Sequence, residues 1–160
     1  MPSHSEKRLM PYTPAQMYDL VGDVARYPEF LPWCSAARIR SRRRQGESEV
    51  VEADLVISFR VFREKFGSRV TLHDDGSLIG IDYLDGPFKY LNSQWRFGPA
   101  PGGCEVDFHV DFEFRSRILQ GVIGLVFGEA MRRIVRAFET RAAQLYGAGS
   151  ETGSGPDSGG

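Results

Sequence analysis

The sequence predicts an α+β domain in which a curved antiparallel sheet grips one long C-terminal helix. Apolar and polar residues alternate through most of residues 35–115, which is the period of strands with one buried face. The connections between these runs are short and rich in Gly, Asp and Pro, so consecutive strands are expected to pair as a meander. Residues 116–146 carry a helical pattern instead, and a helix of that length spans about 45 Å, enough to cross the sheet.

The N-terminal elements are predicted to be one short strand and two short helices. Residues 6–10 form the strand. A capping-box pattern from Thr13 to Gln16 then begins a helix that runs to about Gly22. Residues 23–34 contain two prolines four positions apart, which forbid one continuous helix and predict a short helical turn.

The central strands follow from the alternation itself. The parity of the apolar residues reverses near Val61–Glu64, which predicts a bulge or turn there, and Asp74-Asp75-Gly76 predicts a hairpin turn. The clearest strand is Cys104–Arg115, where even positions are apolar and odd positions are polar. The other strands are expected at Val51–Val61, at Ile79–Tyr83, at Leu91–Phe97, and after the parity break, where Phe62, Phe66, Val70 and Leu72 are the apolar positions.

The long helix, capped by Ser116, is unusual in its first half. Residues 118–131 are apolar nearly all round, whereas the second half is conventionally amphipathic. Gly121, Gly124 and Gly128 leave a shallow groove near one face. Two interpretations stay open: tight packing on strand aromatics, or a mobile wall of a lipid cavity that touches a membrane surface.

Composition excludes several classes of protein. Of 160 residues, 41% are hydrophobic and 26% are charged, which is typical of a globular domain and not of a disordered chain. Twenty basic against 21 acidic residues give no net charge that would attract DNA. Three His and two Cys leave little material for a metal site, and Cys34 and Cys104 are expected to be free thiols.

One folded domain is expected over residues 1–146, followed by a disordered Gly/Ser-rich tail at 147–160. The sequence shows neither the pattern of a secretory signal nor a stretch of about 18 apolar residues that would span a membrane. The expected location is the bacterial cytoplasm, including a peripheral position at the inner face of the inner membrane.

Three segments resemble the signatures of the coenzyme-Q-binding START-like family, which also includes ribosome-association toxins of the RatA type and proteins labelled polyketide cyclase/dehydrase. The third signature is residues 108–114, and the resemblance covers about residues 6–146. The first two signatures consist of Tyr27, Pro28, Phe30, Leu31, Pro32 and Trp33, and of Asp85, Gly86, Pro87 and Phe88.

The resemblance implies a helix-grip fold of the START and Bet v 1 type. It also implies an apolar cavity that binds ubiquinone or a similar polyprenylated lipid in support of respiratory electron transport. Such a ligand needs aromatic and branched side chains around it. The inward positions that supply them, as a set rather than singly, are Trp33, Leu55, Ile57, Phe59, Tyr83, Trp95, Phe97, Phe108, Val110, Phe112, Val122, Ile123, Val126 and Phe127.

The histidines are not placed for catalysis. His109 lies on the polar side of its strand beside Asp107 and Asp111, which indicates a solvated acidic face rather than a metal or acid–base site. His73 lies against a turn, and His4 is expected in a frayed terminus.

Glu64 and Lys65 are expected at the parity break between two strands, where they either orient a polar head group or form a surface ion pair. No acid–base pair is predicted to face the cavity, so we expect a protein that is not an enzyme and has neither a metal nor a catalytic cofactor.

An arginine cluster supports an alternative function. Five arginines in seven positions could contact rRNA phosphates or anionic lipid head groups, or could simply guard an exposed hairpin edge. No aromatic residue interleaves them, which disfavours RNA. The alternative function is that of a toxin that blocks the association of ribosomal subunits and inhibits translation, and the cluster consists of Arg38, Arg40, Arg42, Arg43 and Arg44.

Overall fold

The computed structural model describes residues 3–59 and 62–147, so the predicted tail lies outside the described residues except for Gly147. The predicted order of elements is confirmed. The elements are β1 (Ser3–Met10), α1 (Pro14–Gly22), the 3₁₀ helix η1 (Val24–Glu29), β2 (Cys34–Gln45), β3 (Ser48–Phe59), β4 (Phe62–His73), β5 (Leu78–Asp85), β6 (Phe88–Ala100), β7 (Gly103–Phe114) and α2 (Arg117–Tyr146).

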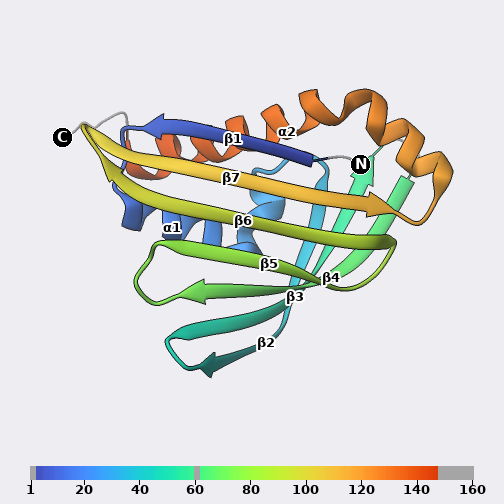
Figure 1. The fold of residues 1–160 in the computed structure, drawn as a ribbon, viewed down its shortest axis with the longest axis horizontal. Coiled ribbons are helices and arrows are strands. Elements are labelled where there is room, and N and C mark those ends of the chain that lie inside the picture. Colours follow the sequence, from blue (N-terminus) through green and yellow to red (C-terminus); the bar gives the residue numbers. More distant parts are fainter. Residues whose placement is uncertain (1–2, 60–61, 148–160) are drawn as a thin grey trace.

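The strands form one seven-stranded antiparallel sheet in the order β1-β7-β6-β5-β4-β3-β2 (Figure 1). Strands β2 to β7 are the predicted meander, in which each strand pairs with the next in sequence. Strand β1 joins the far side of β7, so β1 and β2 are the two edges.

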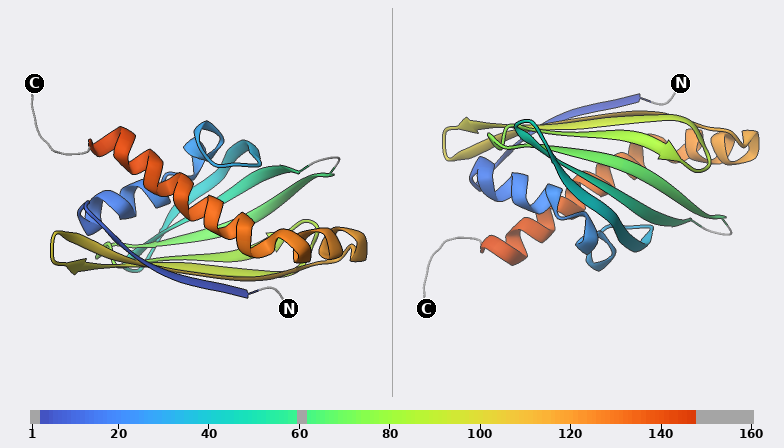
Figure 2. Two further views of the ribbon diagram at one scale, coloured as in Figure 1. Left: turned by 90° about the horizontal axis from the view of Figure 1, so that it is seen from above. Right: turned by 90° about the horizontal axis from the view of Figure 1, so that it is seen from below.

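Helix α2 runs diagonally across the sheet, on the same side as α1 and η1 (Figure 2). The Ser116 side chain caps it by accepting a hydrogen bond from the Leu119 backbone N–H at 3.1 Å. The second half of α2 is tightly packed: the Phe138 ring is buried 4.9 Å from Trp95 and 5.5 Å from Tyr27. The densest part of the core therefore lies under this half, and the first half covers a less filled region.

The segment before β2 forms as the sequence predicts. Thr13 and Gln16 make both hydrogen bonds of the capping box, at 2.9 and 3.0 Å. Pro28 lies inside η1, and the buried Tyr27 hydroxyl donates to the Val21 carbonyl, which ties η1 to α1. Cys34 at the start of β2 is buried and free, as is Cys104.

Two predicted placements are wrong. Strand β1 begins at Ser3, and the register pairs His4 with Val110, so His4 lies in a strand rather than in a frayed terminus. Strand β3 ends at Phe59 and β4 begins at Phe62, so Glu64 and Lys65 lie within β4 rather than at a break. In both cases pairing with a neighbouring strand extends the element beyond its own apolar pattern. The connecting residues 60–61 lie outside the described residues.

Candidate functional site

An apolar cavity of about 210 Å³ lies between the sheet and α2. Its wall comes from the segment after η1, from strands β3, β4, β6 and β7, from the turn before β6, and from α2. All but one of the side chains that line it are apolar. They are Pro32, Trp33, Ile57, Phe59, Glu64, Phe66, Pro87, Phe88, Leu91, Phe108, Val110, Phe112, Phe114, Leu119, Ile123, Ala130, Met131 and Ile134.

Aromatic rings make the floor of the cavity. Phe88 is buried, stacks on Phe114 at 4.5 Å, and meets Phe66 and Phe112 edge-on at 5.2 and 5.6 Å. These rings are in favourable aromatic geometry, so they hold one another without closing the space above them. The lining residues that remain half-exposed, such as Trp33, mark the mouth of the cavity.

The structure brings together seven of the predicted cavity residues: Trp33, Ile57, Phe59, Phe108, Val110, Phe112 and Ile123. The other seven lie outside the lining found among the described residues: Leu55, Tyr83, Trp95, Phe97, Val122, Val126 and Phe127. For the residues at one end of the sheet, the physical reason is that the second half of α2 fills the space above them. Trp95 and Phe97 are buried there as core, so their contact with a ligand is not supported.

Some lining residues were missed by the prediction, chiefly those of α2 and β4. Met131 and Ile134 lie on the same face of α2 as the predicted Ile123, and this spacing in the sequence could have identified them. Phe66 of β4 pairs with Leu55 of β3, and paired residues on neighbouring strands point to the same face of a sheet. Phe66 therefore faces the helix side, where the cavity lies. The missed residues are Glu64, Phe66, Leu91, Phe114, Leu119, Ala130, Met131 and Ile134.

The second signature forms the turn between β5 and β6. Gly86 has a φ of 137°, and a Cβ there would lie 2.7 Å from the Phe66 Cβ and 2.9 Å from the Lys65 carbonyl oxygen. Only glycine fits such a backbone at such a distance. Gly86 thereby allows Pro87 and Phe88 to reach the cavity wall.

The same turn is fixed by an ion cluster on the outer face of the sheet. The Arg40 guanidinium bonds Asp54 at 2.6 Å and Asp85 at 2.9 Å. It passes directly over Gly67, where a Cβ would lie 2.4 Å from the Arg40 Nη2. Asp85 of the signature therefore has a structural role in joining β2, β3 and β5.

The first signature holds the mouth of the cavity. The Phe30 ring lies 5.3 Å from Phe138, and the Leu31 N–H donates to the Tyr27 carbonyl at 2.9 Å. Trp33 follows with a φ of 65°, a conformation that costs a bulky residue about 1–3 kcal/mol. Its ring packs edge-on against Phe59 at 5.7 Å. The signature thus places Trp33, on a strained backbone, at the entrance.

The first half of α2 is apolar on two faces, one that lines the cavity and one that is exposed. Its inner face lines the cavity through residues such as Ile123, whereas on its outer face Leu125 is 88% exposed and Ile118 is 72% exposed. A side chain at Gly121 or Gly124 would meet open space. No helix among the described residues has the length and apolar character needed to cross a membrane.

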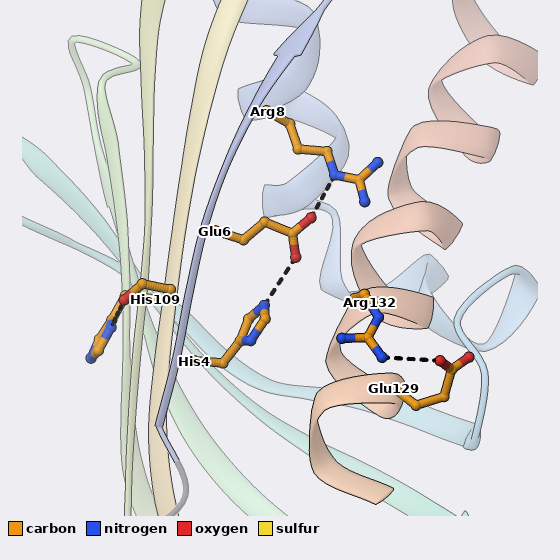
Figure 3. A network of polar contacts seen from close by, with 7 residues as sticks. His4, Glu6, Arg8, His109, Glu129 and Arg132 are labelled. Carbon is orange, nitrogen blue, oxygen red and sulfur yellow. Dashed lines mark hydrogen bonds and ion pairs between the residues drawn. The ribbon is translucent and has the colours of Figure 1, made fainter.

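A polar network ties the edge strand β1 to α2. His4, Glu6 and Arg8 point from β1 toward the helix (Figure 3). Glu6 bonds His4 at 2.9 Å and Arg8 at 2.5 Å, and Arg8 bonds Glu139 of α2 at 3.0 Å. Burial raises the pKa of Glu6, but the hydrogen bonds from His4 and Arg8 outweigh it, so the pKa lies below its ordinary value. The His4 ring also meets Phe127 edge-on at 6.2 Å.

His109 points to the opposite side of the sheet (Figure 3), where its Nδ1 lies 2.7 Å from the Ser5 hydroxyl. Asp107 and Asp111 share its side of the strand. Within residues 3–59 and 62–147, no three His, Cys, Asp or Glu side chains are grouped closely enough to hold a metal ion.

Carboxylates on neighbouring elements neutralise most of the arginine cluster on β2. Four of its five arginines have acidic partners, including Arg40 with the two aspartates named above. The other three pairs are Arg42 with Glu49 at 3.8 Å, Arg43 with Glu52 at 3.4 Å, and Arg44 with Asp74. The pKa values of Asp54 and Asp74 are lowered by hydrogen bonds from their arginines. This arrangement favours the interpretation as a charged sheet edge over a free phosphate-binding surface.

Residues 10–139 match the family model described as polyketide cyclase/dehydrase and lipid transport. A relative from Rickettsia prowazekii (strain Madrid E), named ribosome association toxin RatA, is 42% identical over 91% of this chain and 99% of its own length. A relative from Xenopus laevis, named coenzyme Q-binding protein COQ10 homolog B, mitochondrial, is 32% identical over 90% of this chain and 59% of its own length.

Solved structures show the same architecture. The solution structure of an 18 kDa protein from Caulobacter crescentus has a TM-score of 0.76 and 38% identity, and covers 92% of this chain and 99% of that one. A START superfamily protein from Mycobacterium smegmatis has a TM-score of 0.74 over 89% of this chain and 98% of that one. At 18% identity, the second likeness shows the fold alone. The predicted helix-grip fold is therefore confirmed.

Proposed function

This chain belongs to the START-like polyketide cyclase/dehydrase and lipid-transport family, and we propose that it binds ubiquinone or a close polyprenylated analogue in the cavity under α2. One observation carries the proposal: the cavity of about 210 Å³ is lined by aromatic and branched side chains with a single charged residue. An apolar cavity of about 150 Å³ accommodates benzene, so this one has room for a substituted ring and a short length of chain.

The rest of a polyprenyl tail must then leave through the mouth. The half-exposed mouth residues Trp33, Phe59 and Ile123 offer the tail an apolar path toward the first half of α2. A name that includes coenzyme Q binding in a relative 32% identical to this chain supports a quinone as the occupant.

We propose a carrier rather than an enzyme, although the family description also includes cyclases and dehydrases. Among the described lining residues Glu64 is the one titratable side chain, and it has no second acid or base beside it in the wall. The lipid is thus cargo held for respiratory electron transport and not a catalytic cofactor.

The carrier is proposed to work in the bacterial cytoplasm, with transient contact at the inner face of the inner membrane. The contact surface is the outer stripe of α2, where exposed Ile118 and Leu125 are followed on the same helix face by Arg132 and Arg136. Binding to a membrane surface draws on two contributions: the insertion of apolar side chains and the attraction of basic side chains to anionic lipid head groups.

The lipid proposal is tested by purifying the protein from its host, extracting it with organic solvent and searching for quinone by mass spectrometry. Uptake by the delipidated protein is then measured for Phe112→Asp, which places a charge in the wall, and for His109→Asp on the opposite face of the same strand. We expect uptake to be lost only in the first variant, measured on protein with a native circular dichroism spectrum. An empty extract together with no uptake by the unmodified protein would overturn the proposal.

A second function is favoured by a specific observation, the 42% identity to a relative named as a ribosome association toxin over 99% of its length. Overexpression followed by sucrose-gradient profiles should then lower the ratio of 70S particles to free subunits. An unchanged ratio removes this candidate. The variant Arg42→Glu with Arg43→Glu should weaken contact with an anionic partner while leaving quinone uptake intact.

A further inference from the structure

A second hollow, which we call the arginine groove, borders the mouth of the cavity. It has a volume of about 480 Å³ and lies between α2 and the first signature. Pro32 of that signature lines both the groove and the cavity. On α2, Glu129 and Arg133 line the groove, whereas the next residues along the helix, Ala130 and Ile134, line the cavity. The two spaces therefore meet at one edge of the helix and at one proline.

Each of the two carboxylates that line the groove is shared by two arginines. Glu129 lies 3.1 Å from Arg133 and 3.2 Å from Arg132 (Figure 3). Glu29 accepts a hydrogen bond from Arg141 at 2.5 Å and another from an arginine of η1 at 3.4 Å. The hydrogen bonds from its two arginines hold the pKa of Glu129 below its ordinary value. The arginines around the groove therefore outnumber its carboxylates.

Arg136 is the arginine that this pairing leaves over. It is exposed on α2, lines the groove, and has no hydrogen bond or ion pair within residues 3–59 and 62–147. Thr140 and Gln144 continue the same wall toward the end of α2 and add a hydroxyl and an amide. A guanidinium is weakly hydrated and presents a fork of donors that matches the oxygens of a phosphate. A phosphate in the groove thus meets several donors without breaking either existing pair.

The cavity itself suits the hydrocarbon part of such a ligand. Among the described residues that line it, all but Glu64 are apolar, and a carboxylate repels a phosphate. An amphiphile with an anionic head group can therefore place its chain in the cavity and its head group in the adjoining groove. The chain then removes apolar surface from water, and the head group forms charge-assisted hydrogen bonds, which are the stronger kind.

We propose that the arginine groove binds the phosphate of a prenyl phosphate whose chain lies in the cavity. This inference rests on the proposed lipid-binding function and names a ligand class within it, prenylated lipids with an anionic head group. One hydrogen bond to a charged group corresponds to roughly tenfold or more in affinity. A prenyl phosphate should therefore bind at least tenfold more tightly than the neutral alcohol with the same chain.

The test is a calorimetric titration of the delipidated full chain with farnesyl phosphate and, separately, with farnesol, which has the same chain and no charge. The unmodified protein should bind farnesyl phosphate at least tenfold more tightly. In Arg136→Gln this preference should shrink to about threefold or less, because the phosphate loses a charged donor while the affinity for farnesol stays the same. Since Arg136 is exposed, the variant should keep the Tm of the unmodified protein.

Arg117→Gln is the matched control, because it removes the same charge from an exposed position in the first turn of α2, away from the groove. At physiological ionic strength, exposed charges more than about 8 Å apart are largely screened from each other. This variant should therefore keep the tenfold preference. Inorganic phosphate shows whether the anion binds without a chain, and it should bind at least a hundredfold more weakly than farnesyl phosphate.

Three results would overturn the role of the groove while leaving lipid binding in place. They are equal affinities for farnesyl phosphate and farnesol in the unmodified protein, an undiminished preference in Arg136→Gln, and inorganic phosphate that binds as tightly as farnesyl phosphate. If farnesol, farnesyl phosphate and a short-chain ubiquinone analogue all fail to bind the unmodified protein, the proposed function itself is overturned, and this inference with it.

Discussion

Filling the cavity from α2 should stabilise the ligand-free protein. Ala130 is 3% exposed and lines the cavity. Leu at this position adds three carbon groups to empty apolar space, and at about 0.8 kcal/mol per group this contributes about 2.4 kcal/mol. Ordering the leucine side chain offsets roughly 0.5–1 kcal/mol of that gain. The net stabilisation of about 1.5 kcal/mol corresponds to a rise in Tm of about 3–6 °C for a domain of this size.

The same substitution in packed core gives the matched control. Ala142 lies on the same helix, is fully buried, and is not part of the cavity wall. Ala142→Leu must force neighbouring side chains apart, which costs about 1–3 kcal/mol and lowers Tm. The two leucine variants should therefore change Tm in opposite directions.

Ligand uptake provides the second measurement. The three added carbon groups occupy part of the cavity of about 210 Å³ that a substituted ring would need. Ala130→Leu should thus gain Tm and lose quinone uptake together. A lower Tm would refute the existence of usable space, and a higher Tm with undiminished uptake would refute the cavity as the binding site.

Three further predictions follow from single residues. Gly86→Ala should cost about 2–4 kcal/mol in the free energy of unfolding, from its positive φ and its contact with Phe66, and equilibrium urea unfolding measures this. The pKa of Glu6 in the folded protein lies below its ordinary value of 4.5, so the stabilisation from ionised Glu6 is present above pH 4.5 and is lost as the pH falls through the folded pKa. Glu6→Gln should therefore flatten the decline of Tm between pH 6 and pH 3. An equal decline of Tm in both proteins contradicts this. Burial raises the pKa of Cys34 to about 11 and that of Cys104 above its ordinary value. Both thiols should therefore resist alkylation by iodoacetamide at pH 8 until the protein is unfolded. Rapid alkylation of either thiol in the folded protein counts against this.

The fold was predictable because its strongest signals are local. The strand around Phe108 alternates without interruption, and the helix begins at a serine cap, so both elements form where the sequence predicts. The edge strand β1 was harder, because His4, Glu6 and Arg8 face inward there and break the apolar pattern. Their mutual ion pairs, which only the assembled structure provides, compensate for placing charge against α2.

The site was only half predictable because core and cavity use the same side chains. Alternation identifies Trp95 and Phe108 equally as inward-facing, and nothing local tells which one packs under Phe138 and which one borders open space. That division depends on where the two halves of α2 cross the sheet. Glu64 was noticed but misplaced, because the position of the β3–β4 turn decides which face it occupies.

The cavity itself argues for a ligand. Side chains around an empty cavity of about 210 Å³ lack the packing partners that a filled core provides, so the empty space lowers the stability of the domain. This chain keeps that void next to Trp33, whose backbone conformation further lowers the stability of the empty state. Unfavourable features that cluster at one place are expected where the structure serves binding rather than folding. An apolar occupant that fills the void removes the cost of the empty space, so the occupied protein should be the more stable form and Tm should rise with ligand concentration.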